Sequence, residues 1–402
     1  MPRSSMLWCV LLAASAHATT FYVATTGNDQ NAGTQAAPFK TIAKGLSVMG
    51  TGDTLYLRQG TYNESINSNS VTIPTGTSWA NAPVIASAPG ETATLAVGNA
   101  SELVNLPHAY IQYVRFERLV LDGLGTTDNI ISIGSSGAHH IRVQDCEVKN
   151  SGHIGIFLHG SSNIISGGSV HHIGNTTLFP RPPNRHYSFY VEGTDNVVED
   201  LEIHHTNDYG IHNYSGKPQL SDRNTYRRLK IHDTSLLYSP GAAIIASRSN
   251  DVLIYNNVLY GNHGHGIIAG AEGVETYIFN NTVYGGEQSG IYVEPGSMTA
   301  VVRNNIAFGN ATSQLIEQGT NTTASNNLTV DPQFTDAGAF DFSLQATSPA
   351  IDTGVTLAQV TDDYRGVSRP QGSAYDIGAY EWSAPVVVDM LAPKPPSALQ
   401  VE

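Results

Sequence analysis

An asparagine pair recurs at a constant interval in the C-terminal half of the chain. Asn256-Asn257, Asn280-Asn281 and Asn304-Asn305 are 24 residues apart, and each pair precedes a short apolar segment that ends in an aromatic residue. More diverged copies lie upstream at the same phase, with intervals of 28 and of 32 or 33 residues in the central region. Most copies are followed by a second short strand centred on a Gly-Ile pair, such as Gly210-Ile211. A period of this length indicates stacked structural repeats.

We predict an all-β fold, a right-handed parallel β-helix (solenoid) with an N-terminal capping helix. In such a fold the inward Val, Ile and Leu of each coil stack on those of the next coil, and backbone hydrogen bonds join coils about 4.8 Å apart. The asparagine pairs then form a ladder of side-chain amides along the axis. A chain of 402 residues exceeds the usual size of one compact core, but a repeat fold escapes that limit because each unit packs only on its neighbours.

The N-terminus has the pattern of an export signal. An apolar run from Met6 to Ala14 leads to Ala16-His17-Ala18, a small-x-small cleavage pattern. We therefore expect a signal peptide over 1–18 and a bacterial protein that is secreted, periplasmic or held at the cell surface. Cys146 is then the only cysteine left, which excludes an internal disulfide. A formal net charge of −14 argues against nucleic acid or an anionic membrane as partner. We also expect the protein to be a monomer.

Both ends of the expected mature chain resemble known modules. Phe21-Tyr22-Val23 together with the later Gly60-Thr61-Tyr62 resembles the opening segment of secreted pectate-lyase-like β-helices, which implies first strands and a capping helix over 39–49. Asp331-Pro332-Gln333-Phe334 and the segment 376–381 resemble the choice-of-anchor Q module, which implies a C-terminal cap associated with export or surface attachment. The predicted divisions are 19–100 for the cap and first coils, 101–328 for the repeats, 329–382 for the C-terminal module and 383–402 for a Pro-rich tail.

One outward face of the central coils carries an unusual set of side chains. Strands alternate inward and outward, so if the Ile of each Gly-Ile pair points inward, the residues one and three positions later point outward. Three successive coils then present Phe157 and His159, Tyr190 and Glu192, and His212 and Tyr214 on one face. Aromatic rings stack on pyranose rings, and His and Tyr transfer protons. This pattern predicts a polysaccharide site.

Basic residues and long repeats occur in the same region. Seven of the 20 Lys and Arg residues lie between 181 and 230, and long insertions at one level of a solenoid form the walls of binding grooves. We therefore place the site on coils 153–233. The expected substrate-binding residues are Arg181, Arg185, Glu192, Lys217, Arg223 and His159.

The favoured function is a polysaccharide lyase on a uronate-containing glycan. In β-elimination a base removes the C5 proton, a cation neutralises the carboxylate and an acid protonates the leaving oxygen. His212 or His186 is the expected base and Tyr190 or Tyr214 the expected acid. A glycoside hydrolase, with Glu192 and Asp208 as its carboxylates, and a non-catalytic glycan-binding or adhesin-like scaffold are the alternatives.

We expect no resident metal or cofactor. His171, His204 and His232 share one phase with Tyr260 and are interpreted as a packing stack. Calcium is the alternative, because five central carboxylates could supply oxygen ligands to it, but they do not form the tight acidic cluster of calcium-dependent pectate lyases. These five are Asp195, Glu199, Asp200, Glu202 and Asp208.

Overall fold

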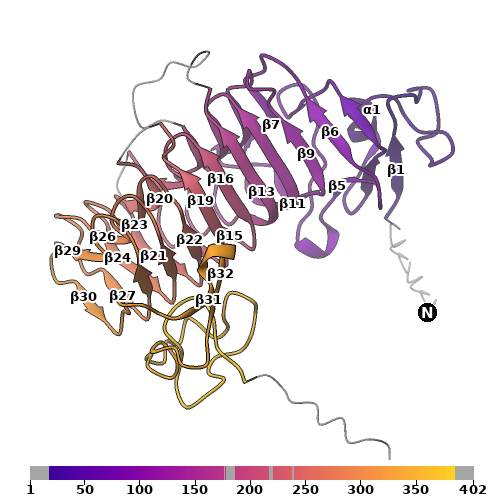
Figure 1. Ribbon diagram of the computed structural model, residues 1–402. Coiled ribbons are helices and arrows are strands. Elements are labelled where there is room, and N and C mark those ends of the chain that lie inside the picture. The colour runs from indigo at the N-terminus through magenta and orange to yellow at the C-terminus, as the bar shows by residue number, and fades with distance from the viewer. Residues whose placement is uncertain (1–17, 176, 178–185, 217–220, 238–239, 385–402) are drawn as a thin grey trace, which may run out of the picture.

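The chain winds into an elongated solenoid of short parallel strands, seen in a computed structural model (Figure 1). The structure describes residues 18–175, 177, 186–216, 221–237 and 240–384. Within them a 20-stranded sheet bends to form two faces of the solenoid, and a 10-stranded sheet forms the third. Every strand in these faces pairs in parallel with the strand one coil away, as the repeat predicts.

The first and second faces belong to the bent sheet. The first contains β1 (Thr20–Val23), β2 (Thr54–Leu57), β5 (Val84–Ser87), β8 (Gln112–Glu117), the first parts of β11 (His139–Ser151) and β13 (Ile164–Ile173), β15 (Val197–Glu199), β18 (Thr225–Arg227), β21 (Asn250–Tyr255), β24 (Val274–Phe279), β27 (Val301–Arg303) and β30 (Thr323–Ser325). The second contains β3 (Gly60–Tyr62), β6 (Ala93–Ala96), β9 (Leu119–Asp122), the second parts of β11 and β13, β16 (Glu202–Thr206), β19 (Lys230–Thr234), β22 (Val258–Tyr260), β25 (Thr282–Tyr284) and β28 (Ile306–Phe308).

The third face is the 10-stranded sheet of the described chain. It contains β4 (Ile66–Asn67), β7 (Glu102–His108), β10 (Asn129–Ser136), β12 (Ile154–Leu158), β14 (Tyr187–Val191), β17 (Ile211–Tyr214), β20 (Ala242–Ser247), β23 (His265–Ala269), β26 (Ile291–Val293) and β29 (Leu315–Glu317).

A helix closes the first coil. α1 (Ile42–Val48) begins after Thr41, whose side chain accepts a hydrogen bond from the Lys44 N–H. Ile42 and Leu46 are buried, and a Cβ on Gly45 would lie 2.6 Å from a Leu55 methyl, so the helix packs directly on the first strands. The predicted cap over 39–49 is confirmed, with slightly narrower bounds.

Asparagine ladders run along the solenoid, as predicted for the doubled asparagines. The Asn257 side chain donates to Asn281 Oδ1 and Asn281 donates to Asn305 Oδ1, both at 2.9 Å. The first Asn of each pair has another role: Asn256 has φ of 53° and donates to the Asp362 carbonyl at 2.7 Å. Asn304 Nδ2 in turn donates to Asn280 Oδ1 at 3.3 Å, so the first members also contribute a bond to the predicted ladder.

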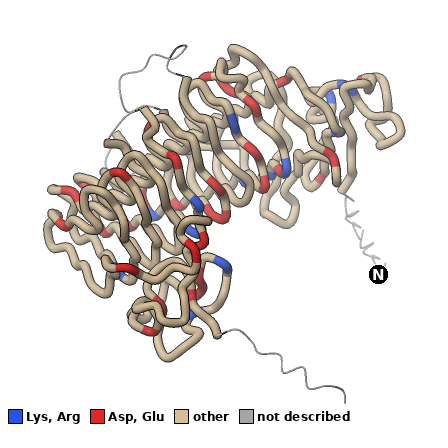
Figure 2. The backbone as a smooth tube through the Cα atoms, viewed as in Figure 1, with Lys and Arg blue, Asp and Glu red and all other residues tan. Residues whose placement is uncertain are grey.

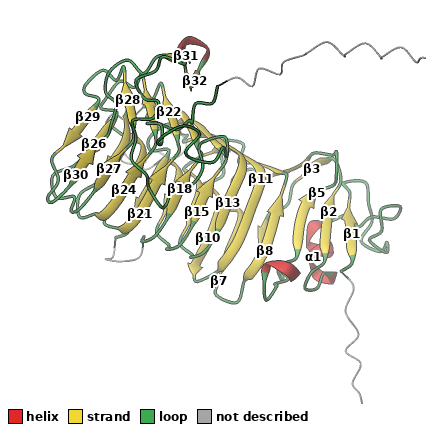
Figure 3. Ribbon diagram, turned by 90° about the horizontal axis from the view of Figure 1, so that it is seen from below, coloured by secondary structure: helices red, strands yellow, loops and turns green. Residues whose placement is uncertain are grey.

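The C-terminal segment, residues 329–384, packs on the second face and on its edge with the first. Phe334 and Phe342, from the antiparallel strands β31 (Phe334–Asp336) and β32 (Asp341–Leu344), form a cluster with Tyr260 and Tyr284. Figure 3 shows this segment lying over the solenoid at β22 and β28. Two short 3-10 helices complete the described elements, η1 (Trp79–Asn81) and η2 (Ala337–Ala339). No helix in the described chain is long and apolar enough to cross a membrane.

Candidate functional site

Aromatic side chains form a continuous cluster on the third face. Phe157, Tyr190 and His212 occupy equivalent positions on β12, β14 and β17. The ring centroids of Phe157 and Tyr190 are 4.8 Å apart, and those of Tyr190 and His212 are 5.3 Å apart. The coil-to-coil spacing thus brings the predicted outward residues into direct contact.

His212 lies at the centre of this cluster. Four tyrosine rings surround it with centroid separations of 4.9 to 5.3 Å, namely Tyr187, Tyr190, Tyr209 and Tyr214. Its Nδ1 is buried and has no hydrogen-bond partner among the described residues. Burial lowers the pKa of His212 to about 3, although the nearby Glu192 carboxylate opposes the shift. The imidazole is therefore neutral, with a basic nitrogen, at any pH above about 4.

A hydrogen-bonded carboxylate borders the cluster on one side. Glu192 Oε2 lies 2.9 Å from Nδ1 of His159, and the Tyr190 hydroxyl also bonds to this carboxylate. The hydrogen bond from His159 is the largest of the effects that lower the pKa of Glu192. Glu192 is thus held in its ionised form and fixes both the Tyr190 ring and the His159 ring, which packs on Phe157 at 3.6 Å between centroids.

A cation borders the cluster on the opposite side. Arg248, immediately after β20, donates from Nη1 to the Tyr214 hydroxyl at 3.2 Å and forms an ion pair with Glu272. Its guanidinium lies 5.7 Å from the centre of the Tyr214 ring. The sequence analysis did not identify Arg248, Tyr187 or Tyr209 as site residues.

The backbone around the Gly-Ile pairs explains why Tyr187 and Tyr209 were missed. A Cβ on Gly155 would lie 2.9 Å from a methyl of Val170, a core residue, so the glycine points inward as does the Ile that follows it. Two successive inward positions break strict alternation. The residues one place before the glycine position, which include Tyr187 and Tyr209, therefore point outward and join the cluster.

Several predicted residues lie elsewhere. His186, one of the two expected bases, is fully buried with its ring 5.7 Å from that of His153, so it does not lie on the outer surface where a polysaccharide would bind. Arg223 makes a two-point ion pair with Asp195 at 2.7 and 2.8 Å in the turn before β18, away from the aromatic cluster. Arg181, Arg185 and Lys217 lie outside the described residues.

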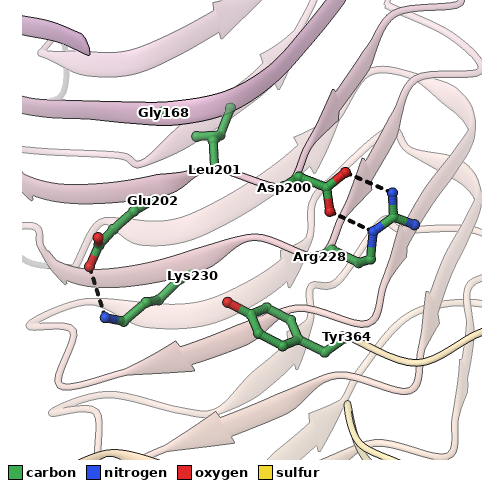
Figure 4. A pocket seen from close by; sticks show the side chains of 7 residues that line it. All are labelled: Gly168, Asp200, Leu201, Glu202, Arg228, Lys230 and Tyr364. Carbon is green, nitrogen blue, oxygen red and sulfur yellow. Dashed lines mark hydrogen bonds and ion pairs between the residues drawn. The ribbon is translucent and has the colours of Figure 1, made fainter. Parts of the chain in front are cut away.

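The other cations of the predicted basic group also pair with acids one coil earlier. Arg228 bonds to Asp200 at 2.6 Å and Lys230 to Glu202 at 2.9 Å, and both pairs line a pocket between the second face and Tyr364 of the C-terminal segment (Figure 4). Figure 2 shows the Lys and Arg residues scattered among Asp and Glu along the coils rather than gathered in one patch. The sequence clustering of basic residues therefore does not produce a basic groove in the described part of the chain.

The nominated pair of hydrolytic carboxylates is not supported. Asp208 is 0% exposed in the turn before β17, and neither of its carboxylate oxygens bonds to a described residue. Burial raises the pKa of Asp208 to about 8. Glu192 lies on the outer surface, so the two groups do not flank a common binding surface as a hydrolase requires.

Comparisons with known proteins agree with this architecture. Residues 21–184 match a family described as the Pel9A-like right-handed beta helix region, and residues 182–329 match a right-handed beta helix region. The fold is a right-handed parallel β-helix. No curated protein matches the sequence significantly.

Solved structures resemble this β-helix over most of its length. Pectate lyase Pel9A gives a TM-score of 0.69 at 16% identity and covers 91% of this chain and 96% of its own. A glycoside hydrolase gives 0.58 at 9% identity, with 82% and 99% covered. A GH136 lacto-N-biosidase from Eubacterium ramulus gives 0.52 at 12% identity, with 77% and 67% covered. At these identities the similarity shows the fold alone.

Proposed function

We propose that the protein is a carbohydrate-active protein that binds a polysaccharide along the third face and cleaves a uronate-containing chain by β-elimination. The observation that carries the proposal is the neutral His212 imidazole, which is enclosed by four tyrosine rings, one of them bonded to Arg248. Aromatic faces bind the apolar faces of sugar rings, and a base and a cation within one aromatic surface are what elimination requires.

Each component of the site has a role in this reaction. Arg248 offsets the charge of the uronate carboxylate, which makes the C5 proton more acidic. The His212 imidazole takes that proton, and the electrons of the C5–H bond form the C4=C5 double bond as the C4–O4 bond breaks. The carboxylate of the bound sugar favours the imidazolium that results, which counteracts the low pKa of His212 in the free protein.

Tyr214 is the better placed of the two candidate acids. Its hydroxyl oxygen accepts a hydrogen bond from Arg248, which leaves its own proton available for O4 of the leaving sugar. The Tyr190 hydroxyl is instead bonded to the Glu192 carboxylate. Tyr190, Phe157 and His159 then act as a platform for the sugar, held in place by Glu192.

Two further points support a carbohydrate substrate. The structure named pectate lyase Pel9A matches nearly the whole chain, and two of the other similar structures are named as glycoside-acting enzymes. An export signal over 1–18 would deliver the protein to the bacterial periplasm, surface or medium, where polysaccharides are met. We include this location in the proposal.

Glycan binding without catalysis is the second candidate. The low pKa of His212 favours it, because a base is most effective when its pKa is near the working pH. The aromatic surface alone would suffice for such a role.

The deciding experiment uses a panel of uronate polysaccharides, with and without chelator. Unsaturated-product absorbance and reducing ends are measured for the wild type, His212→Gln and the control His263→Gln, which alters a partly exposed histidine paired with Glu287. We expect new absorbance that falls by at least about 100-fold in His212→Gln and is retained in the control. Reducing ends without absorbance would indicate a hydrolase. Binding without any product, unchanged by chelator, would establish the non-catalytic role.

A further inference from the structure

Histidines form a two-by-two array on the second face, away from the aromatic cluster. His171 on β13 and His204 on β16 are register partners, and their rings stack at 4.7 Å with an angle of 5°. Their sequence neighbours His172 and His205 stack in the same way at 4.8 Å and 12°. The predicted stack of His171, His204 and His232 is present, since His204 and His232 are 5.1 Å apart at 3°, but the second column was not foreseen.

A left-handed backbone brings each pair of neighbours together. His172 and His205 have φ of 55° and 52°, whereas neighbouring side chains of a regular strand point to opposite faces. As a result Nδ1 of His171 lies 2.7 Å from Nδ1 of His172, and Nδ1 of His204 lies 2.7 Å from Nδ1 of His205. Ring nitrogens of neighbouring residues are thus brought together in each coil.

The contact of His171 with Glu147 determines which of its ring nitrogens carries the lone pair. Its Nε2 lies 3.1 Å from Glu147 Oε1, and a carboxylate accepts a proton donor. In the neutral ring the proton is then on Nε2 and the lone pair is on Nδ1.

We propose that His171, His172 and His204 bind one divalent transition-metal ion. One ligand nitrogen from each lies within 4.8 Å of the others, and imidazole nitrogen is a preferred ligand of Cu²⁺, Ni²⁺ and Zn²⁺. Glu147 orients His171 from behind, an arrangement that commonly supports metal-bound histidine. The exposed His172 and His205 leave the outer side of the ion open to solvent.

The spacing of the nitrogens favours Cu²⁺ or Ni²⁺ over Zn²⁺. Two nitrogens 2.7 Å apart, each bound at about 2.0–2.1 Å, subtend an angle of about 80° at the ion. This is closer to the right angle of square-planar or octahedral coordination than to the roughly 109° of the tetrahedral sites typical of zinc.

A second histidine pair in the chain provides a matched control. His139 and His140 also bring Nδ1 atoms together, at 2.6 Å, and His140 has φ of 54°. Their neighbours are Tyr113 and Trp79 rather than a second histidine pair. Among the described residues, the group that brings three potential metal ligands together consists of His171, His172 and His204, and it does not include His139 or His140.

The test is calorimetric titration of the full chain, prepared without a histidine tag, with Cu²⁺, Ni²⁺ and Zn²⁺ separately. The variants are His172→Asn, Glu147→Gln and the control His140→Asn; asparagine tolerates positive φ, so both histidine replacements suit the backbone. We expect one Cu²⁺ per chain, binding in the order Cu²⁺, Ni²⁺, Zn²⁺, and nitrogen coupling in the electron paramagnetic resonance spectrum of the Cu²⁺ form. Affinity should fall at least about tenfold in His172→Asn and in Glu147→Gln and stay within about twofold in the control.

Two results would overturn the proposal. One is a wild-type Kd for Cu²⁺ weaker than about 1 mM. The other is an equal loss in His172→Asn and His140→Asn, which would indicate adventitious binding by surface histidines. If the histidine variant fails to fold, Glu147→Gln alone decides, because it keeps all imidazoles and removes only the carboxylate that orients His171.

Discussion

Replacing Asp208 with asparagine should stabilise the protein by an amount that increases with pH. Asp208 is 0% exposed, its carboxylate oxygens have no described hydrogen-bond partner, and burial raises its pKa to about 8. In the unfolded chain an aspartate has a pKa of about 3.9. Between these values the unfolded chain releases a proton that the native protein keeps.

The sign and size of the effect follow from this difference. As pH rises from about 4 to about 8, the native state loses about 1.4 kcal/mol of stability per pH unit relative to the unfolded state. The cumulative cost reaches about 6 kcal/mol, an order-of-magnitude upper bound. Asparagine has nearly the same shape and no charge at any of these pH values. The gain from Asp208→Asn should therefore be close to zero near pH 4 and largest near pH 8.

The assay is urea unfolding of wild type and Asp208→Asn at several pH values across this range. Asp222→Asn is the control, because Asp222 is also buried but its oxygens accept hydrogen bonds from Asn250 at 2.8 and 3.2 Å. That variant should show no gain that grows with pH. A difference between Asp208→Asn and wild type that is independent of pH would refute the reasoning, since Asp208 would then have the same proton affinity in both states.

Three other predictions concern the site and the scaffold. If His212 is the base, its low pKa keeps it unprotonated in mild acid, so the acid limb of kcat/KM should lie below about pH 5; a limb near pH 6.5 would assign the base to another group. Arg369→Ala should cost about 3–5 kcal/mol, because it leaves Glu381 unpaired where both side chains are 0% exposed, and limited proteolysis should then release the C-terminal segment. Asn281→Ala should lower the unfolding midpoint by removing the amide that joins Asn257 to Asn305, at about 1–3 kcal/mol per unsatisfied group, as checked by thermal melts.

The repeat predicted the fold because each coil is built from the same short strands and turns, and these leave a regular pattern in the sequence. The same logic found Phe157, Tyr190 and His212, which stand one place after an inward residue. It failed where the backbone departs from strict alternation. Tyr187 and Tyr209 point outward because the glycine position of each Gly-Ile pair points inward as well. The contact between His172 and His171 depends on the left-handed φ of His172. A sequence pattern that assumes alternating strand residues does not predict this contact.

The basic residues were misread because their partners are far away in sequence. Arg223 pairs with Asp195, Arg227 with Glu199 and Lys230 with Glu202. Each pair is separated by 28 residues, which is the length of that repeat. Opposite charges at the period of a solenoid are therefore a usable signal for ion pairs between coils. A count of Lys and Arg residues over one stretch of sequence does not reveal these acidic partners.

These ion pairs change what the basic residues contribute to the proposed site. The acids follow β14 and the cations follow β17, so the pairs join the two coils that carry Tyr190 and His212. Each exposed pair is worth at most about 1 kcal/mol, but all of them oppose the same sliding of one coil along the next. The distance of 5.3 Å between the Tyr190 and His212 rings depends on that register. These cations therefore stabilise the register of the coils that carry the aromatic cluster. In the proposed site the cation assigned to the uronate is Arg248, which is itself paired with Glu272.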